Sequence, residues 1–239
     1  MKYLLDIIIP VYNEGDNIIP TLESIYTNVS VNFNVLICYD FKSDNTLTSI
    51  KKSKFNHDKK IKFIKNNEAG PHAAVMSGIY SSSADFLLVL PADDDYNSKL
   101  IDRMTKIAIT QHADIICPSR FIAGGSMKGA PLIKKIVVIF ANLSLKYLAF
   151  MPVSDSTNGF RMFSRKVVKN IKIDSKIGFT YSIEYLVKAH RFRYSIKEIP
   201  AIWKERKFGK SRFQFYSWML PYLRWYFYAF FTLILRIIK

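Results

Sequence analysis

The sequence predicts an α/β fold in which a mostly parallel central sheet is flanked by helices on both faces. In the first half of the chain, short apolar runs alternate with segments of helical periodicity, and the connections between them are short. The length of 239 residues and the hydrophobic content of 49% suit one sizeable domain with a large core. A disordered chain is therefore excluded.

The short apolar runs are expected to form the strands of this sheet. In chain order they are Leu4–Ile9, Val35–Cys38, Ile61–Ile64, Phe86–Leu90, Ile115–Cys117 and, after a less regular region, Ser195–Ile199. In that region Gly124, Gly125 and Gly129 indicate a mobile loop, and the polar segment Asp155–Phe163 turns at Gly159.

Helices are expected between these strands. The first is predicted by apolar residues at helical spacing, namely Ile18, Ile19, Leu22, Ile25 and Tyr26. Asp44 suits the N-cap of the second helix, and Pro71 suits the first turn of a third that runs to about Ser83. The segments Leu100–Thr110 and Tyr181–His190 complete the set.

The charge of the chain is strongly positive, with 35 Lys and Arg against 19 Asp and Glu and a net charge of +16. Such an excess indicates an anionic partner, which is a nucleic acid, a membrane surface or a phosphorylated substrate.

The two cysteines, Cys38 and Cys117, lie in apolar runs and form neither a disulfide framework nor a metal-binding set. We therefore expect a cytoplasmic location, and the N-terminal apolar stretch does not resemble a signal peptide.

The C-terminal segment is apolar and aromatic. Between Phe213 and Leu235 the only charge is Arg224, beside Pro221 and among several Trp and Tyr residues. An interfacial helix on a membrane is the first expectation, a helix packed on the core the second, and a membrane span the third. We therefore expect a domain at 1–212 and a membrane-associated tail at 213–239. Leu132–Phe150 is a second strongly apolar segment.

Three consecutive aspartates, Asp93, Asp94 and Asp95, follow the strand at 86–90. Ligands of open α/β sheets bind beyond the carboxyl ends of the strands. Alternate residues of an extended segment share a face, so Asp93 and Asp95 can hold one divalent cation while Asp94 points away. The alternative is an acidic turn that caps the helix beginning near Asn97 or Ser98.

Other candidate ligand-binding residues also follow strands. Pro10, Tyr12 and Glu14 close the first strand, where a ring and a carboxylate suit a nucleoside, and Asp40 closes the second. The alternative for the first group is a strand-to-helix turn with an acidic first turn. Neither of the glycine-rich phosphate loops Gly-x-Gly-x-x-Gly and Gly-x4-Gly-Lys-Ser/Thr is present, so a diphosphate would need a metal at this acidic edge.

Motifs in a fixed order run through the chain: Pro10-Val11-Tyr12-Asn13-Glu14, the segment Tyr39–Thr46, Ala92-Asp93-Asp94-Asp95, Ser119-Arg120-Phe121 with Gly124-Gly125, the segment Asp155–Arg161, and Arg206, Gly209, Ser211 and Arg212. In order and composition they resemble the motifs of inverting family 2 glycosyltransferases with a GT-A fold. More narrowly, they resemble the motifs of the dolichyl- and polyprenyl-phosphate sugar synthases, over roughly residues 4–212.

The resemblance implies a nucleotide-sugar site, a divalent metal and an acceptor-phosphate site. The nucleotide-sugar site would comprise Pro10, Tyr12, Glu14, Cys38, Asp40, Ala92, Asp93 and Asp94. Mg²⁺ or Mn²⁺ would be held by Asp93 and Asp95. The acceptor phosphate would be bound by Arg120, Lys134, Lys135, Arg206 and Arg212, and the catalytic set would be Asp93, Asp95, Arg120 and Arg206.

The chain departs from the family pattern at four positions. Tyr39 replaces the first of two paired aspartates, and Pro91 replaces the first aspartate of the metal motif. Asp95 stands where many members have a metal-binding Gln, and Arg212 stands for a closing Lys.

The sequence leaves three functions open. The first is inverting transfer from a GDP- or UDP-linked sugar to polyprenyl or dolichyl phosphate at a membrane surface, in which the acceptor is already an anion and needs no base. The second is transfer to a sugar hydroxyl, with Asp155 or Glu184 as the base unless these carboxylates pair with the arginines. The third is a non-catalytic membrane- or nucleic-acid-binding protein, but the sequence has no nucleic-acid-binding motif, so no nucleic-acid partner is expected.

Overall fold

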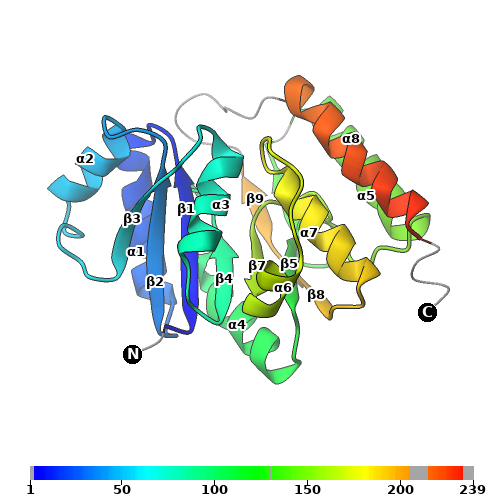
Figure 1. The fold of residues 1–239 in the computed structure, drawn as a ribbon, viewed down its shortest axis with the longest axis horizontal. Helices are drawn as coiled ribbons and strands as arrows, with labels where there is room; N and C mark the ends of the chain where they lie inside the picture. The colour runs from blue at the N-terminus through cyan, green and yellow to red at the C-terminus, as the bar shows by residue number, and fades with distance from the viewer. Residues whose placement is uncertain (1–2, 130, 205–214, 234–239) are drawn as a thin grey trace.

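A computed structural model of the chain describes residues 3–129, 131–204 and 215–233 (Figure 1). Its centre is a seven-stranded sheet of order β3-β2-β1-β4-β7-β5-β8, and a smaller sheet pairs β6 with β9. The strands are β1 (Leu5–Val11), β2 (Phe33–Tyr39), β3 (Ile61–Lys65), β4 (Phe86–Val89), β5 (Ile115–Ser119), β6 (Ser126–Lys128), β7 (Arg161–Ser164), β8 (Ile196–Pro200) and β9 (Ile202–Lys204). The helices are α1 (Ile18–Asn28), α2 (Asn45–Lys52), α3 (Pro71–Ser81), α4 (Ile101–Thr110), α5 (Leu132–Tyr147), α6 (Arg165–Asn170), α7 (Thr180–Arg191) and α8 (Phe215–Phe231), with 3₁₀ turns η1 (Gly15–Asn17) and η2 (Asn97–Leu100).

The predicted, mostly parallel sheet is confirmed. β1 runs parallel to β2 and β4, β2 to β3, and β5 to β8. One strand, β7, is antiparallel to both of its neighbours, β4 and β5. The sequence does not reveal β7 because this short strand begins with a charged residue. Arg161 is fully buried, and its guanidinium donates to the backbone carbonyls of Asp155, Ser156 and Ser182.

Helices cover both faces of the sheet, as predicted. On β1, Leu5, Ile7 and Ile9 point to one core, which also contains buried residues of α1, α2 and α4. Ile8 points to the other core, which contains buried residues of α3, α5, α6, α7 and α8. This alternation follows from the two-residue period of a strand, and it explains why the strands read as nearly continuous apolar runs.

Local signals place two of the helices. Asp44 caps α2, because its side chain accepts a hydrogen bond from the backbone N–H of Thr46, and Pro71 is the first residue of α3. α3 ends at Ser81, two residues before the predicted end near Ser83. It lies very close to the sheet at Gly78, where a Cβ atom would approach Ile8 Cγ2 to 2.5 Å. Glycine is therefore needed at this position.

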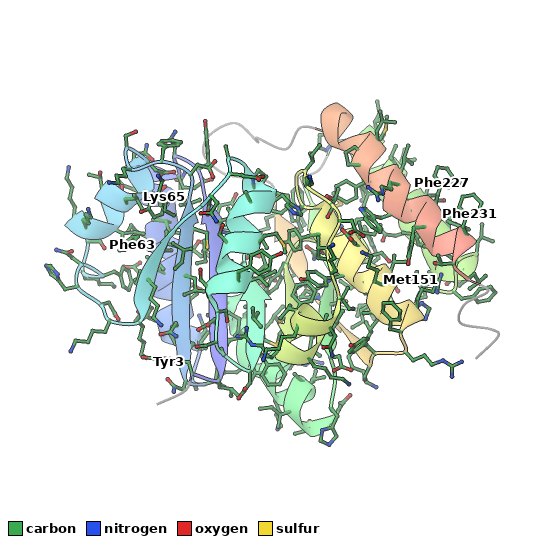
Figure 2. The ribbon with its side chains drawn as sticks, viewed as in Figure 1. Tyr3, Phe63, Lys65, Met151, Phe227 and Phe231 are labelled. Atoms are coloured by element: carbon green, nitrogen blue, oxygen red, sulfur yellow. The ribbon has the colours of Figure 1, made fainter. Side chains whose placement is uncertain are left out.

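The described part of the predicted tail is a helix that packs on the domain. α8 contacts α7, and its Trp225 and Ala229 are buried in the core that also contains residues of α3 and α7. Phe227 and Phe231, on another face of α8, project from the outside of the molecule (Figure 2). The predicted boundary at residue 212 lies outside the described residues. Among the helices that the structure describes, none has the length and apolar character needed to span a membrane.

Candidate active site

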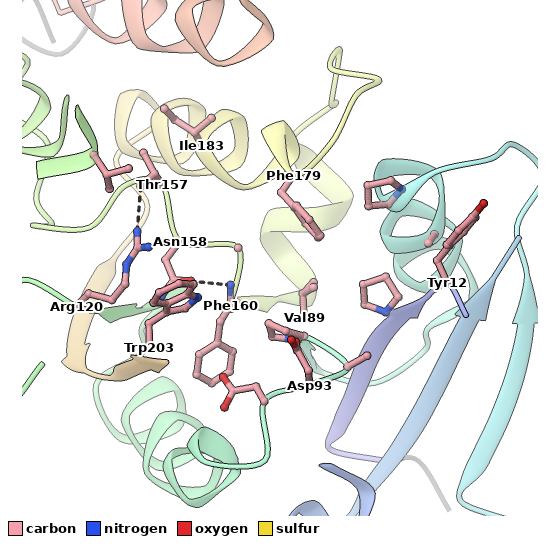
Figure 3. Close-up of a pocket in the computed structure, with 18 of the residues that line it drawn as sticks. Tyr12, Val89, Asp93, Arg120, Thr157, Asn158, Phe160, Phe179, Ile183 and Trp203 are labelled. Carbon is pink, nitrogen blue, oxygen red and sulfur yellow. Dashed lines mark hydrogen bonds between the residues drawn. The ribbon is translucent and has the colours of Figure 1, made fainter. Parts of the chain in front are cut away.

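A cavity of about 1340 Å³ lies at the carboxyl ends of β1, β2 and β4 (Figure 3). One part of its wall is made by the residues that follow these strands. The opposite part is made by α5, α7, α8 and the loop before β7. This is the position at which open α/β sheets bind ligands. The predicted residues Pro10, Tyr12, Glu14, Asp40, Ala92, Asp93, Asp94, Asp95 and Arg120 all line it.

The loop after β1 is held by the beginning of α2. The backbone N–H of Asn13 donates to Asp44 Oδ2 (2.9 Å), and that of Glu14 donates to Thr46 Oγ1 (2.9 Å). Asp44 thus fixes the loop as well as the helix, a role that its spacing alone does not reveal. The Tyr12 ring meets Phe41 edge-on, with centroids 5.4 Å apart. Tyr12 is therefore presented to the cavity from a fixed backbone.

The Asp40 carboxylate is oriented by two donors. Asn66 Nδ2 donates to Asp40 Oδ1 (2.7 Å), and the backbone N–H of Gly70 donates to Asp40 Oδ2 (3.0 Å). Neither Asn66 nor Gly70 was predicted as a site residue, because each follows β3 or precedes α3 without a charge of its own. Each Asp40 oxygen keeps acceptor capacity for a ligand in the cavity.

The acidic triplet divides into two roles. Asp94 accepts from the backbone N–H groups of Tyr96 and Asn97, and both its oxygens accept from Asn97 Nδ2. Burial raises the pKa of the Asp94 carboxyl, although the hydrogen bonds from Asn97 oppose that shift. Asp94 therefore holds the turn before α4, and its assignment to the nucleotide-sugar site is not supported by these bonds.

Asp93 and Asp95 remain as candidate metal ligands, since both are exposed and line the cavity. Within the described ranges, no three His, Cys, Asp or Glu side chains come together as a metal-binding group. A magnesium-type ion is nevertheless commonly held by one or two carboxylates, with the substrate phosphates and water as the other ligands. The two oxygen-donor side chains fit an ion of that kind when a diphosphate is bound.

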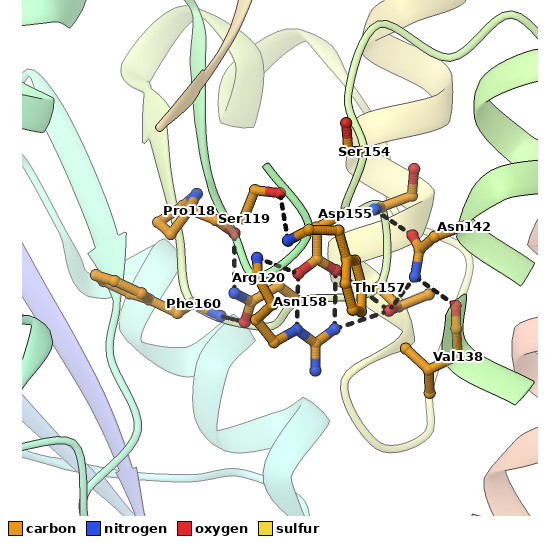
Figure 4. Close-up of polar contacts among 12 residues, drawn as sticks. Pro118, Ser119, Arg120, Val138, Asn142, Ser154, Asp155, Thr157, Asn158 and Phe160 are labelled. Carbon is orange, nitrogen blue, oxygen red and sulfur yellow. Dashed lines mark hydrogen bonds and ion pairs between the residues drawn. The ribbon is translucent and has the colours of Figure 1, made fainter. Parts of the chain in front are cut away.

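Arg120 is fixed by a buried carboxylate (Figure 4). Its Nε and Nη2 atoms donate to Asp155 Oδ2 (2.7 Å) and Oδ1 (2.8 Å), and its backbone N–H donates to Oδ2 (3.0 Å). Asp155 is 0% exposed, and its own backbone N–H donates to Glu198 Oε1. The Asp155 carboxylate is thus a partner of Arg120, one of the two roles that the sequence left open for it.

Glu184 has a similar buried, fully engaged position. Its carboxylate accepts from the backbone N–H groups of Asp174 and Ser175 and from Lys188 Nζ (2.6 Å). Its partner is thus a lysine of its own helix and not one of the predicted arginines. Both carboxylates that the sequence offered as a general base are therefore bound to cations and removed from solvent.

The far wall of the cavity is apolar. α5 contributes Val137, Val138, Ala141 and Leu145, and α8 contributes Met219, Tyr222, Leu223 and Tyr226. Tyr226 joins the two helices, since its hydroxyl lies 2.8 Å from Ser144 Oγ. The cavity is therefore lined by acidic strand ends, by Arg120 and by a hydrophobic surface.

Some predicted site residues are not at this cavity. Cys38 is fully buried beneath Gly78 of α3, so its side chain cannot contact a ligand, and this corrects its assignment to the nucleotide-sugar site. Lys135 is exposed on α5 and does not line the cavity. Arg206 and Arg212 lie outside the described residues, and so does the side chain of Lys134.

The sequence of this chain is similar to those of known glycosyltransferases. The family described as "Glycosyl transferase family 2" matches residues 6–172. The dolichol-phosphate mannosyltransferase of Pyrococcus furiosus is 25% identical over 218 residues, which are 87% of this chain and 58% of that protein. The polyprenol monophosphomannose synthase of Mycolicibacterium smegmatis is 24% identical over 213 residues, which are 86% of this chain and 79% of that protein. This chain thus spans less than two thirds of the length of the Pyrococcus relative.

Solved structures share the fold. The glucosyl-3-phosphoglycerate synthase of Mycobacterium tuberculosis, solved with Mn²⁺, UDP and phosphoglyceric acid, has a TM-score of 0.73 to this chain. The comparison covers 95% of this chain and 78% of that one, at 11% sequence identity. The same enzyme has been solved with Mg²⁺ and UDP, at a TM-score of 0.72 and 12% identity. At such identities the similarity is one of fold alone.

Proposed function

Because the chain belongs to glycosyltransferase family 2, we propose that it is an inverting enzyme that transfers a sugar from a GDP- or UDP-linked donor to polyprenyl or dolichyl phosphate. The names of the two curated relatives support this class of acceptor. The nucleotide sugar would lie at the strand ends, between Tyr12, Asp40 and Asp93. The lipid phosphate would lie beside Arg120.

One observation carries the proposal: acidic strand ends, Arg120 and an apolar wall all line a single cavity. A nucleoside diphosphate needs hydrogen-bonding groups and a cation, whereas a prenyl chain needs an apolar surface. Val137, Ala141 and Leu223 supply such a surface. A soluble sugar acceptor would leave these side chains without a function in binding.

The state of the carboxylates favours a phosphate acceptor over a sugar hydroxyl. A hydroxyl needs a general base, whereas a phosphate is an anion at neutral pH and can attack without losing a proton. Asp155 and Glu184 are both buried and paired with cations, so neither is available to accept a proton from an acceptor.

What the protein must overcome is repulsion between two anions, the acceptor phosphate and the donor diphosphate. Asp93 and Asp95 would hold the divalent ion, which would neutralise charge on the leaving diphosphate. Arg120 presents a guanidinium from the opposite side of the cavity, and guanidinium groups bind phosphate oxygens in pairs. Two hydrogen bonds from this guanidinium to the buried Asp155 carboxylate keep Arg120 at the cavity wall before a ligand arrives.

The test is a transfer assay with purified protein. We expect that incubation with a polyprenyl phosphate, Mg²⁺ or Mn²⁺ and a panel of GDP- and UDP-sugars yields one glycolipid with a sugar-phosphate-lipid mass and an inverted anomeric centre. The matched acceptor control is the free polyprenol, which lacks the phosphate and should give no product. Transfer to the free alcohol or to a glycan hydroxyl, with polyprenyl phosphate inert, would contradict the proposed acceptor.

The outer surface of α5 and α8 supports docking on a membrane. It exposes large apolar side chains beside the apolar wall of the cavity: Leu132, Ile133, Ile136, Phe140, Leu220, Phe227 and Phe231. Large apolar side chains that are exposed together on two contacting helices mark an interaction site. Membrane lipid is the occupant that we propose, because the acceptor resides there and the net charge of +16 attracts an anionic bilayer surface.

Sedimentation with vesicles tests this docking. We expect Phe140→Glu to reduce binding to vesicles that contain anionic lipid by about tenfold or more, since burying a Phe side chain contributes about 1.5–3 kcal/mol. The control is Phe63→Glu, which places the same change on β3 at the opposite end of the molecule from α5 and α8 (Figure 2). Equal binding of both variants and the unchanged protein would exclude this surface.

A further inference from the structure

A single amide side chain connects α5 to the loop before β7. Asn142 is only 2% exposed, in a helix whose outer surface is apolar. Its Oδ1 atom accepts from the backbone N–H of Ser156 (2.6 Å). Its Nδ2 atom donates to Thr157 Oγ1 (3.2 Å) and to the carbonyl of Val138 (2.9 Å). Both donors of the amide are thus used, and its orientation is defined by its partners (Figure 4).

The Thr157 hydroxyl is the next member of this network. It accepts one hydrogen bond from Asn142 Nδ2 and a second from Arg120 Nη2 (3.1 Å). Its own proton is left for Asp155 Oδ1, which lies 3.5 Å away. A hydroxyl has one donor and two acceptor sites, so the described neighbours satisfy all of them. Such a group has a single favourable orientation.

This network determines which edge of Arg120 faces the cavity. The Nε and Nη2 groups donate to Asp155, and the second N–H of Nη2 is used by Thr157. Among the described residues no hydrogen-bond partner is found for Nη1, and Arg120 lines the cavity. Phe121 lies beside the guanidinium, 5.2 Å from ring centroid to Cζ. The Nη1 edge is therefore the one available to a phosphate.

We propose that Asn142 and Thr157 are positioning residues that hold the Nη1 edge of Arg120 toward the acceptor phosphate. The proposal rests on the function proposed above, since the acceptor phosphate is the group that Arg120 would bind. Asp155 bonds only the Nε–Nη2 edge of the guanidinium, so with Asp155 alone the guanidinium could still tilt about that edge. Thr157 supplies a third point of attachment, and Asn142 fixes Thr157 to α5, whose outer face is the proposed membrane surface. Small errors in the orientation of such a group are costly to catalysis.

The Thr157→Val variant tests this positioning. Valine keeps the shape of threonine and removes the hydroxyl, so Arg120 retains Asp155 but loses the third contact. We expect kcat/KM for polyprenyl phosphate to fall about tenfold, the change expected when one hydrogen bond to a charged group is lost. The KM for the nucleotide sugar should not change, because the hydrogen bonds of Thr157 go to Arg120, Asn142 and Asp155, and none of these is assigned to the nucleotide sugar. Thr157→Ser should restore activity, since serine supplies the same hydroxyl.

Two controls separate positioning from a merely structural role. Thr110→Val removes an exposed hydroxyl that bonds to Lys106 at the end of α4, and it should leave transfer unchanged. In an Arg120→Lys background, Thr157→Val should have no further effect, because the group that it positions is absent. A structural role would instead lower activity in both backgrounds and would not be rescued by serine.

The outcomes are distinguishable. If the unchanged protein does not glycosylate polyprenyl phosphate, the proposed function fails, and the positioning role fails with it. If the unchanged protein is active and Thr157→Val has the same kcat/KM for the acceptor, the proposed function stands and the positioning role is wrong. An equal loss in the Arg120→Lys background also overturns the positioning role.

Discussion

Replacement of Asp93 by asparagine is expected to reduce glycosyl transfer by roughly 1,000-fold, which corresponds to about 4 kcal/mol of transition-state stabilisation. Asparagine has nearly the same shape but lacks the negative charge that holds a divalent ion. The leaving diphosphate then develops its charge without that cation. The measurement is the initial rate of glycolipid formation at saturating Mn²⁺, with Mn²⁺ binding in the presence of nucleoside diphosphate followed by electron paramagnetic resonance.

The fold should survive this substitution, since Asp93 is exposed at the cavity wall. Its thermal unfolding is therefore expected to match that of the unchanged protein. The matched control is Glu23→Gln, which removes a carboxylate from the exposed Lys54–Glu23 pair on the surface and should alter neither rate nor metal binding. Near-normal turnover and Mn²⁺ binding in Asp93→Asn would refute the metal assignment.

The acidic half of the site could be predicted from the sequence because the order of the parallel strands brings its carboxylates to one edge of the sheet. Asp40 and Asp93 are far apart in the chain, but each follows a strand of a parallel set, and β1 lies between β2 and β4. The carboxyl ends of parallel strands meet at one edge of the sheet. Recognition of two apolar strands therefore places both carboxylates at the cavity.

The cationic half could not be predicted in the same way. Arg120 meets Asp155 because the antiparallel strand β7 inserts between β4 and β5. β7 is short and begins with the buried charge of Arg161, so its sequence lacks the apolar run that identified the other strands. Backbone carbonyls accept hydrogen bonds from both Nη atoms of that side chain, and a sequence does not show which carbonyls are near. The partners of Arg120 thus depend on a strand that periodicity does not detect.

The role of α8 was also ambiguous for a physical reason. The helix is apolar around most of its circumference, as suits either a core helix or a membrane-facing helix. In the structure it combines both properties: Trp225 and Ala229, four residues apart, face the core, and Phe227 and Phe231 are exposed. Composition alone does not distinguish these faces, because both are hydrophobic.

Two replacements of Arg120 are expected to distinguish the effect of its positive charge on transfer from the effect of its planar shape. Arg120→Lys keeps the positive charge but removes the planar guanidinium. The lysine ammonium lacks the two separate edges with which arginine can bind Asp155 and a phosphate at the same time. We expect it to lower kcat/KM for polyprenyl phosphate by about 100-fold, the equivalent of roughly two hydrogen bonds between charged groups. Arg120→Gln should lose more activity and should also be less stable by about 3–5 kcal/mol, because the buried Asp155 carboxylate loses its cation.

A second substitution resolves whether Arg120 matters for the reaction or only for Asp155. In the double variant Arg120→Gln with Asp155→Asn, both charges are gone, so no unpaired charge is buried and much of the lost stability should return. Transfer should remain low, because no guanidinium is left to meet the acceptor phosphate. The two readouts are thermal unfolding and the acceptor kcat/KM. Recovery of both together would mean that Arg120 serves only as the counter-ion of Asp155, and that the acceptor phosphate is bound by other residues.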